Sequence, residues 1–522
     1  MGIYFNPKPD AFLLARNTNP YIDKSMLIDR LNEFIDTERR FICVSRPRRF
    51  GKTMATNMIA AYYAENTDAN ALFESLKIMR SDSFKRYCNK YIVLKINMQE
   101  FVSRDRAIDD VIKRLNSRLS SELTRLFDDI TFYEDGDIIE CMKQLNDERD
   151  RRFVVIIDEW DCIFREYPDD HLAQRKYLDF LRDFLKDRAY IALAYMTGIL
   201  PIKKYGTESA LNMFQEISME NPGNMAEFTG FTEDEVREIC ASLNADFEEC
   251  RTWYDGYSFL KTKHVFNPNS VVTAATTGVY DDYWNKTETY KALQNYIDLN
   301  FVGLRDSIIK MMAGDRQKIN TGSFQNDMTS FGVADDVLTL LIHLGYLGYD
   351  FATKEVFIPN KEIMQEFITA TTSNNGWREV INSVNESETL LSSTWNGKEN
   401  EVATGIEKAH LETSHLQYND ENALSYTISL AYYAAREYYN VVRELPTGKG
   451  FADLCFIPKQ RYIDKTAMIV ELKWNKSAET AINQIRERQY PASLKDYAGN
   501  ILLVGINYDK ETKKHTCRIE KA

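Results

Sequence analysis

Four short, near-continuous apolar runs constrain the fold of the first half of this chain more than any other feature. They are FICVS, YIVLKINM, FVVIID and AYIALAYMT, which begin at residues 41, 91, 153 and 189. Segments with helical periodicity separate them. Strands that are apolar along their whole length are typical of a parallel sheet that is covered on both faces by crossover helices. We therefore expect residues 1–230 to form one α/β domain.

Three further parts are expected after this domain, since a chain of 522 residues is too long for one core. FTEDEVREICASL carries a capping-box pattern at Thr232 and Glu235, which begins a helical subdomain over residues 231–300. Residues 301–372 predict helix, strand, turn, strand and helix, which suits a winged-helix-like subdomain or a generic helical lid. A polar, Ser- and Asn-rich linker then leads into the last domain, residues 373–522.

Composition limits the class of protein. Hydrophobic residues make up 44% and charged residues 27% of the chain, and the mean hydropathy is -0.43, as in soluble globular proteins. No apolar stretch approaches the roughly 18 residues that span a bilayer, and the first residues lack the pattern of a signal peptide. We expect a cytoplasmic protein that binds no membrane. The 8 cysteines form no C-x-x-C pair, so we expect reduced thiols and no zinc site.

Charge is unevenly distributed along the chain. The 65 Lys and Arg residues face 78 Asp and Glu, and a net charge of -13 argues against nonspecific coating of nucleic acid, which needs a cationic surface. From residue 401 onward, 17 Lys and Arg balance 16 Asp and Glu. If nucleic acid is bound, the C-terminal part is therefore the better candidate.

The stretch SRPRRFGKT, residues 45–53, ends like a phosphate-binding loop. In such a loop, backbone amides at a strand-to-helix turn surround the phosphates, the Lys pairs with them, and the hydroxyl holds Mg²⁺. Gly51, Lys52 and Thr53 supply the end of the motif between a predicted strand and a predicted helix. The first glycine of the motif is missing, because position 46 is Arg46. A G-K-T triplet alone is weak evidence.

A second motif strengthens the nucleotide-site hypothesis. FVVIIDEWD is an apolar strand that ends in Asp158 and Glu159, where one carboxylate holds the water shell of Mg²⁺ and the next polarises the attacking water. The following strand ends in Thr197, which either senses the γ-phosphate or forms a turn with the next glycine. Upstream, YIDKS places Tyr21, Asp23 and Lys24 where they either contact the nucleotide or only cap a helix.

A third pattern lies in the last domain. GFADLCFIP and AMIVELKWN predict two strands of a hairpin, the first carrying Asp453 and the second Glu471 and Lys473. With a period of two, Glu471 and Lys473 point to the same face. Two carboxylates that bind Mg²⁺ and a lysine that acts on water or phosphate are what metal-assisted phosphodiester hydrolysis requires. The pattern is permissive, because salt-bridged strand pairs also produce it.

Together these motifs resemble a family, the bacterial AAA-ATPase-like proteins with a C-terminal PD-(D/E)XK nuclease-superfamily domain. The resemblance spans nearly the whole chain, and RPRRFGK is its most specific string. It implies an ASCE/AAA-like P-loop NTPase domain that binds ATP, since the arginine-bearing loop is usual in that family. The motifs that carry it are YIDKS, SRPRRFGKT, IIDEWD, MTGI, FTGFTEDEV, WYDGYSF followed by FNPNS, and IPNKE.

For the last domain, the resemblance implies an α/β nuclease fold. There Glu421, at a helix start, matches the family's acidic residue that completes the metal site, Gln484 contacts the scissile region, and Tyr490 packs. The resemblance implies less about activity, because many members of this superfamily keep the fold after losing cleavage.

The arginines of the loop allow two interpretations. Guanidinium forks suit phosphate oxygens better than lysines do, and one of them could stabilise transferred-phosphate charge. Equally, they could pin the loop to neighbouring groups. The expected nucleotide-binding residues are Arg46, Arg48, Arg49, Gly51, Lys52, Thr53, Asp158 and Thr197; the expected catalytic residues are Glu159, Asp453, Glu471 and Lys473; the expected metal ligands are Thr53, Asp158, Glu421, Asp453 and Glu471.

Three functions are compatible with these patterns. The first is an ATP-hydrolysing protein whose NTPase domain controls a Mg²⁺-dependent nuclease acting on nucleic acid, with DNA favoured over RNA. The second is a nucleotide-controlled switch with a catalytically inactive nuclease fold. The third is an interaction protein that binds nucleotide without turnover. The intact carboxylates and lysine favour the first function, whereas the acidic bulk of the chain favours the others.

Overall fold

The computed structural model describes residues 2–102, 107–205, 208–259, 261–284, 289–299, 301–372, 378–412, 421–447, 450–488, 490, 494 and 500–522. The chain forms two compact units. The first contains Met1–Thr287 and Lys318–Met364, and the second contains Glu288–Gln317 and Gln365–Ala522. The division into four parts that the sequence suggests stays a prediction.

A five-stranded parallel sheet with the strand order β2-β3-β4-β1-β7 forms the centre of the first unit. The four strands predicted from the apolar runs are confirmed, and the short fifth strand was not predicted. Strand β4 lies between the strand before the phosphate loop and the strand before the acidic pair, as in an ASCE/AAA-like P-loop NTPase fold. The strands are β1 (Phe41–Ser45), β2 (Ile92–Asn97), β3 (Phe153–Asp158), β4 (Ile191–Gly198) and β7 (Gln215–Ile217).

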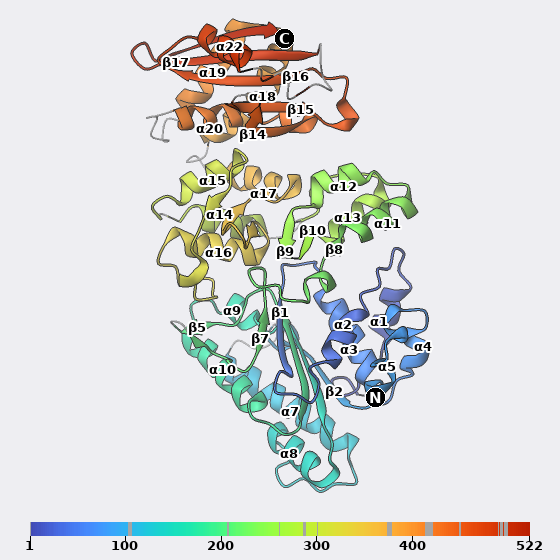
Figure 1. Cartoon of the computed structure of the whole chain (residues 1–522). Helices are drawn as coiled ribbons and strands as arrows, with labels where there is room; N and C mark the ends of the chain where they lie inside the picture. Colours follow the sequence, from blue (N-terminus) through green and yellow to red (C-terminus); the bar gives the residue numbers. More distant parts are fainter. Residues whose placement is uncertain are drawn as a thin grey trace. The chain divides into compact units, whose positions relative to one another are not determined.

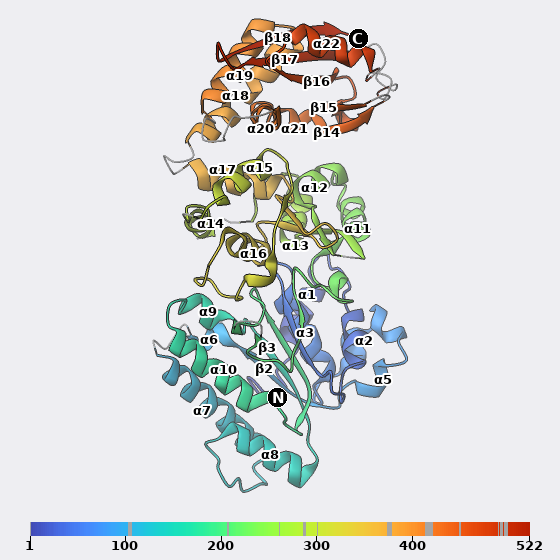
Figure 2. The ribbon, with the colours of Figure 1, turned by 60° about the vertical axis from the view of Figure 1, so that its left-hand side comes forward.

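Helices cover both faces of this sheet, so that β1, β3 and β4 are buried along their whole length. One side carries α1 (Asp10–Arg16), α2 (Met26–Asn32), α3 (Lys52–Tyr63), α4 (Ala69–Phe73) and α5 (Phe84–Tyr87), and the other carries α7 (Ile108–Leu126), α8 (Ile138–Arg149) and α10 (His171–Leu185) (Figures 1 and 2). The short helices α6 (Met98–Val102) and α9 (Cys162–Glu166) follow β2 and β3.

The rest of the first unit is mainly helical. Its capping box at Thr232 and Glu235 is confirmed at the start of α11. The predicted order of helix, strand, turn, strand and helix is also observed, from α16 to α17. The elements are β8 (Phe231–Thr232), α11 (Glu233–Leu243), α12 (Phe247–Tyr254), β9 (Tyr257–Phe259), β10 (Thr262–Phe266), α13 (Pro268–Thr277), α16 (Ala334–Leu344), β12 (Gly348–Asp350), β13 (Glu355–Phe357) and α17 (Lys361–Thr372). The boundary of the first unit falls within α17, after Met364.

A second five-stranded sheet, with the order β14-β15-β16-β17-β18, forms the centre of the second unit. All neighbours are antiparallel except β16 and β17, which are parallel. This mixed α/β fold agrees with the predicted nuclease-like domain. The strands are β14 (Tyr439–Thr447), β15 (Gly450–Pro458), β16 (Ala467–Trp474), β17 (Ile501–Asp509) and β18 (Lys514–Lys521).

Each face of this second sheet has its own hydrophobic core. Leu454, Val470 and Leu472 pack with residues of α18 (Arg378–Trp395), α19 (Glu399–Glu412) and α20 (Glu421–Ala431). Cys455 and Ile469, on the opposite face, pack with residues of α22 (Ala478–Glu487). Because side chains alternate along a strand, Glu471 and Lys473 belong to the α22 face. The unit also contains α14 (Thr289–Ile297), α15 (Leu304–Met312) and α21 (Ala435–Tyr438).

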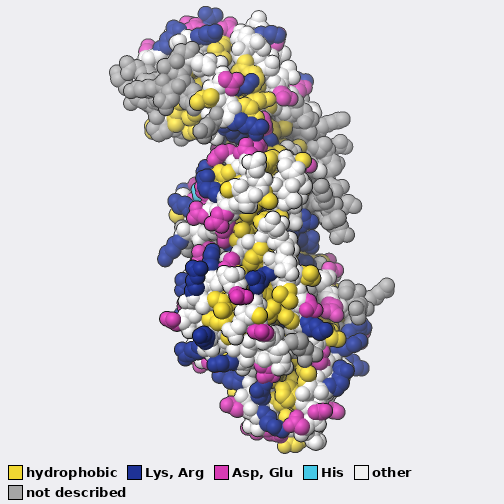
Figure 3. Space-filling view, turned by 90° about the vertical axis from the view of Figure 1, so that its right-hand side faces the viewer, with side chains coloured by type: hydrophobic (Ala, Val, Ile, Leu, Met, Phe, Trp, Pro, Cys, Tyr) yellow, Lys and Arg dark blue, Asp and Glu magenta, His cyan; other side chains and the backbone are white. Residues whose placement is uncertain are grey.

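Among the described residues, no helix is long and apolar enough to cross a membrane. Lysine and arginine side chains are interspersed with aspartate and glutamate side chains on the face shown in Figure 3, with hydrophobic side chains between them.

Candidate functional site

The phosphate loop connects β1 to α3 and turns at Gly51, whose φ of 84° lies in the left-handed region that favours glycine. Helix α3 begins at Lys52, so its first backbone amides face the loop and attract anions. The Lys52 ammonium donates to the carbonyl oxygens of Arg46 at 2.9 Å and Pro47 at 2.8 Å. Burial lowers the pKa of Lys52, while the carboxylates of Glu159 and Asp161 act in the opposite direction.

A pocket of about 540 Å³ borders this loop and has the size of a small-molecule site. Its polar lining residues include Arg48, Arg49, Lys52, Thr53 and Glu159. Apolar side chains also line the pocket and suit the base of a nucleotide. They include Phe12, Tyr21, Met54, Met58, Phe228 and Phe231. Tyr21 and Lys24 both line the pocket, whereas Asp23 is engaged by the backbone amides of Ser25 and Lys77.

Asp158 ends β3 inside the protein. It is fully buried, and its Oδ1 accepts a hydrogen bond from the amide of Glu159 at 3.1 Å. Its Oδ2 has no hydrogen-bond partner among the described residues. Burial raises the pKa of Asp158, while the hydroxyl of Thr53 and the cations of Lys95 and Lys52 oppose the shift. A buried carboxylate oxygen without a partner, next to a hydroxyl, fits a ligand of Mg²⁺.

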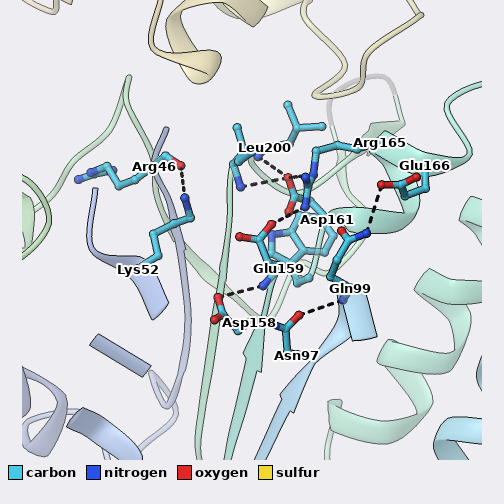
Figure 4. A network of polar contacts seen from close by, with 12 residues as sticks. Arg46, Lys52, Asn97, Gln99, Asp158, Glu159, Asp161, Arg165, Glu166 and Leu200 are labelled. Atoms are coloured by element: carbon cyan, nitrogen blue, oxygen red, sulfur yellow. Dashed lines mark hydrogen bonds and ion pairs between the residues drawn. The ribbon is translucent and has the colours of Figure 1, made fainter. Parts of the chain in front are cut away.

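Glu159 lies at the pocket wall with a φ of 53°. Its Oε2 accepts a hydrogen bond from the guanidinium of Arg165, which also lies 3.5 Å from Oδ2 of Asp161 (Figure 4). Burial raises the pKa of Glu159, and Arg165 lowers it. Sequence reasoning missed both Asp161 and Arg165. The available signal was their spacing of four residues, which brings them together on a helical turn.

Besides Asp158, two further predicted nucleotide-binding residues, Thr197 and Arg46, lie outside the lining of this pocket. Thr197 is buried, and its hydroxyl donates to the carbonyl oxygen of Val44 at 3.0 Å. Arg46 is also buried, with its guanidinium carbon 4.8 Å from the ring centre of Phe259. Burial lowers the pKa of Arg46 to about 10. The nucleotide-binding roles of these two residues stay predictions, and their positions favour structural roles.

Other motifs of the resemblance contact the phosphate loop or one another. Arg49 donates to the carbonyl oxygen of Tyr283 at 2.7 Å, and the amide of Tyr283 donates to Oε1 of Glu362 at 2.8 Å. Ser270 of FNPNS also donates to Glu362 of IPNKE, at 2.8 Å. Phe50 packs edge-on against Tyr257 of WYDGYSF, with ring centres 5.4 Å apart. The phosphate loop is thus linked through Tyr283 and Tyr257 to these motifs.

A second cluster of polar side chains lies on β15 and β16. The carboxylate of Asp453 accepts a hydrogen bond from the amide of Leu472 at 2.7 Å, which ties the two strands together. The ammonium of Lys473 donates to Oε1 of Glu471 at 2.9 Å. The structure thus brings together the three residues that the sequence grouped. Gln484 of α22 donates to the same oxygen of Glu471.

Glu471 is almost completely buried, with 1% of its surface exposed. Burial and the nearby Asp453 raise its pKa to about 7, although Lys473 acts in the opposite direction. Its Oε2 has no hydrogen-bond partner among the described residues. The residues present therefore fit a divalent cation. Its positive charge would stabilise the ionised form of this buried carboxylate.

Two predicted members of this cluster have different outcomes. Glu421 is the first residue of α20, but its side chain lies outside the described part of the chain. Within the described ranges, no three His, Cys, Asp or Glu side chains gather as a metal site. Tyr490 is buried and donates to the carbonyl oxygen of Phe451 at 2.7 Å, which fits the packing role expected for it.

Two parts of the chain are similar to known protein families. A model described as predicted AAA-ATPase matches residues 12–207, and a model described as PD-(D/E)XK nuclease superfamily matches residues 421–517. A protein from Azotobacter chroococcum mcd 1, described as an uncharacterized protein in the vnfD 5' region, is 26% identical over 276 residues. The match covers 52% of this chain and 51% of that protein, so the chain spans about half the length of this relative.

Solved structures match with low scores. Cdc6p from Pyrobaculum aerophilum has a TM-score of 0.25 and 11% identity, covering 70% of this chain and 97% of its own. The ORC1 protein of Aeropyrum pernix, solved in complex with DNA, has a TM-score of 0.24 and 12% identity, covering 95% and 100%. The ORC2 protein of the same organism has a TM-score of 0.27 and 11% identity, covering 70% and 98%.

Proposed function

We propose that this chain, which joins an AAA-ATPase-like domain to a domain of the PD-(D/E)XK nuclease superfamily, hydrolyses ATP and thereby controls Mg²⁺-dependent cleavage of nucleic acid. ATP hydrolysis is supported by one pocket that is lined by the phosphate loop, the start of α3 and Glu159. Cleavage of nucleic acid is supported by the contact of Glu471 with Lys473 beside Asp453.

In the first unit, the amides at the start of α3 and the ammonium of Lys52 bind the phosphates. Lys52 exchanges its two carbonyl partners in the loop for phosphate oxygens, which are stronger acceptors because they are charged. Thr53 and Asp158 would hold Mg²⁺, which would supply positive charge to the phosphates. Glu159 then accepts the proton of the attacking water. The apolar side chains of the pocket lining receive the base.

In the second unit, Asp453 and Glu471 would hold the divalent cation, which would supply activation of water and a counter-charge for the scissile phosphate. Lys473 contacts Glu471 in the described structure and lies on the same face of the sheet, where it orients the water or binds the phosphate. Gln484, bound to Glu471, orients that carboxylate. Hydrolysis breaks one P–O bond and adds the elements of water across it.

The proposal includes control of the nuclease by the ATPase. It follows from the presence of both domains in one chain. Nucleic acid as the substrate follows from the nuclease-superfamily domain, which also lies in the part of the chain without an acidic excess. We propose DNA rather than RNA as the first substrate to test.

The test is incubation of the purified full-length chain with DNA and with RNA, each with and without ATP and Mg²⁺. We expect cleavage that needs Mg²⁺ and that changes with ATP, and we expect none from Asp453→Ala under the same conditions. Lys52→Ala should lose the ATP dependence alone. ATP hydrolysis without cleavage of any nucleic acid would instead support the nucleotide-controlled switch with an inactive nuclease fold.

A further inference from the structure

Arg165 connects the two carboxylates that follow β3. It lies on α9, donates a hydrogen bond to Oε2 of Glu159, and forms an ion pair with Asp161 at 3.5 Å (Figure 4). Only 12% of its side-chain surface is exposed. These charge-assisted contacts therefore form mostly away from water, where they are stronger and more directional than at the surface.

Asp161 fixes the far end of this arrangement. Its Oδ2 accepts hydrogen bonds from the amides of Ile199 at 3.0 Å and Leu200 at 2.9 Å, directly after β4. A Cβ atom at Gly198 would lie 2.5 Å from its Oδ1, so a larger residue there would displace Asp161. Asp161 is thus held by the backbone that follows β4, and Arg165 is anchored to a fixed carboxylate.

Glu159 depends on such an anchor. Its backbone has a φ of 53°, an uncommon conformation for a residue other than glycine, and 24% of its side chain is exposed at the pocket. A partly exposed glutamate has several rotamers of similar energy. The bond from Arg165 to Oε2 selects one of them and leaves Oε1 to accept a proton on the side of the phosphate loop.

We propose that Arg165 is a positioning residue for ATP hydrolysis, which holds Glu159 by Oε2 while it is anchored through Asp161 to the end of β4. The inference rests on the proposed ATPase function. Arg165 is not among the residues that line the pocket, so it acts through Glu159 and not on the nucleotide. Its loss therefore affects turnover more than nucleotide binding, since only the transition state needs the oriented base.

The first test compares Arg165→Met with Arg165→Lys. We expect Arg165→Met to lower kcat for ATP at least about 10-fold, while the ATP affinity measured by calorimetry changes less than about threefold. Arg165→Lys restores part of the loss, because it keeps the charge without the fork that holds two carboxylates. Arg149→Met is the matched control, since Arg149 also pairs with a carboxylate, Asp129, but lies half exposed on α8.

The second test measures the effect of Arg165→Met in a protein that lacks the Glu159 carboxylate. In the Glu159→Gln variant, adding Arg165→Met should cause no further loss of the residual single-turnover rate. A general effect on the fold would instead lower the rate by the same factor in the parent and in the Glu159→Gln variant. Because Arg165→Met leaves Asp161 as an unpaired buried charge, the double variant Asp161→Asn with Arg165→Met tests whether the loss persists once that charge is removed.

Three results would overturn the inference: turnover of Arg165→Met within twofold of the parent, equal loss of affinity and turnover, or a full additional loss in the Glu159→Gln background. A parent protein that binds ATP without hydrolysing it would overturn the proposed ATPase function, and the inference with it. Failure of the inference alone requires an active parent, so the two failures are distinguishable.

Discussion

The guanidinium of Arg46 packs over the ring of Phe259, with 4.8 Å between its central carbon and the ring centre. Its Nη1 donates to the carbonyl oxygen of Ser45 at 2.9 Å, but its Nε and Nη2 have no hydrogen-bond partner within the described residues. Arg46 replaces the first glycine of a usual phosphate loop. It turns away from the pocket, so the loop keeps its anion-binding end at Gly51 and Lys52 while its first half is packed into the protein.

We predict that Arg46→Met leaves the free energy of unfolding unchanged within about 1 kcal/mol or increases it. The substitution removes the hydrogen bonds from Nη1 to the carbonyl oxygens of Ser45 and Ile217 and a cation–π contact worth about 2 kcal/mol, but it also removes a buried cation with two unpaired donors. ATP affinity should change less than about threefold. Chemical denaturation and calorimetry measure the two quantities. A large loss of affinity would instead support the phosphate-binding interpretation of Arg46.

Lys52→Met should weaken ATP binding at least about 100-fold, since it removes a buried ammonium that several phosphate oxygens would otherwise share. Glu159→Gln should retain binding and lose hydrolysis. Calorimetry with a slowly hydrolysed ATP analogue measures the binding of each variant. Lys85→Met, at an exposed lysine of the same unit, is the control. Unchanged ATP affinity in Lys52→Met would refute the assignment of the loop.

The remaining two arginines of the loop should differ from each other. Both are exposed and line the pocket, but Arg49 is tied to the carbonyl oxygen of Tyr283. We predict that Arg48→Ala lowers ATP turnover more than ATP affinity, because an arginine at the pocket acts on charge that develops in the transition state. Arg49→Ala should lower both to a similar extent by loosening the loop. Steady-state kinetics with parallel binding measurements separates these patterns.

The central strands of both units were predictable from local pattern, because each is a buried apolar run between turn signals. The same holds for Glu471 and Lys473, since the alternation of side chains along a strand places them on one face. Strand β7, with three residues and an exposed start, carries too weak a pattern to be recognised. Its place beside β1 depends on packing between segments that are far apart in the sequence.

The contacts of the candidate sites were less predictable than their residues. The motif showed that Arg46, Arg48 and Arg49 belong to the loop, but the stacking of Arg46 on Phe259 joins residues more than two hundred positions apart. Likewise, nothing local to FNPNS or IPNKE indicates that Ser270 bonds to Glu362. Composition and periodicity report the face of an element on which a residue lies, whereas the partner on that face is set by the tertiary fold.

Glu362 should make the stability of the first unit depend on pH. Burial raises its pKa to about 8, well above the value in an unfolded chain. The folded state therefore binds the proton more tightly, and the stability that this provides is complete below about pH 4.5 and is lost as the pH rises through about 8. The free energy of unfolding of the parent should therefore fall between pH 5 and pH 9. Glu362→Gln, which resembles the protonated acid, should make this fall smaller by of order 2 to 4 kcal/mol.

Denaturation at a series of pH values measures this effect. Glu238→Gln, at an exposed glutamate of the same unit, is the control and should leave the pH profile unchanged. An identical profile for Glu362→Gln and the parent would mean that Glu362 is already ionised in the folded protein at neutral pH.

The last prediction concerns Asp453, Glu471 and Lys473. If the first two hold a catalytic Mg²⁺ and the lysine acts on water or phosphate, each single Ala variant should lose nearly all cleavage. Residues that act as one unit give losses that do not add, so a double variant should be no worse than either single variant. ATP hydrolysis should stay near the parent level, since these residues belong to the second unit.

Exposed neighbours on the same segment provide matched controls for this cluster. Lys476 is exposed three positions after Lys473, and Glu479 is exposed eight positions after Glu471, so Lys476→Ala and Glu479→Ala change the same residue types and both should cleave like the parent. Mn²⁺ should replace Mg²⁺, whereas Ca²⁺ should bind without supporting cleavage because its coordination is larger and less regular. Cleavage that survives all three substitutions would show that the activity arises at another site or from another protein. Loss of cleavage together with ATP hydrolysis would show that the variants disturb the whole chain.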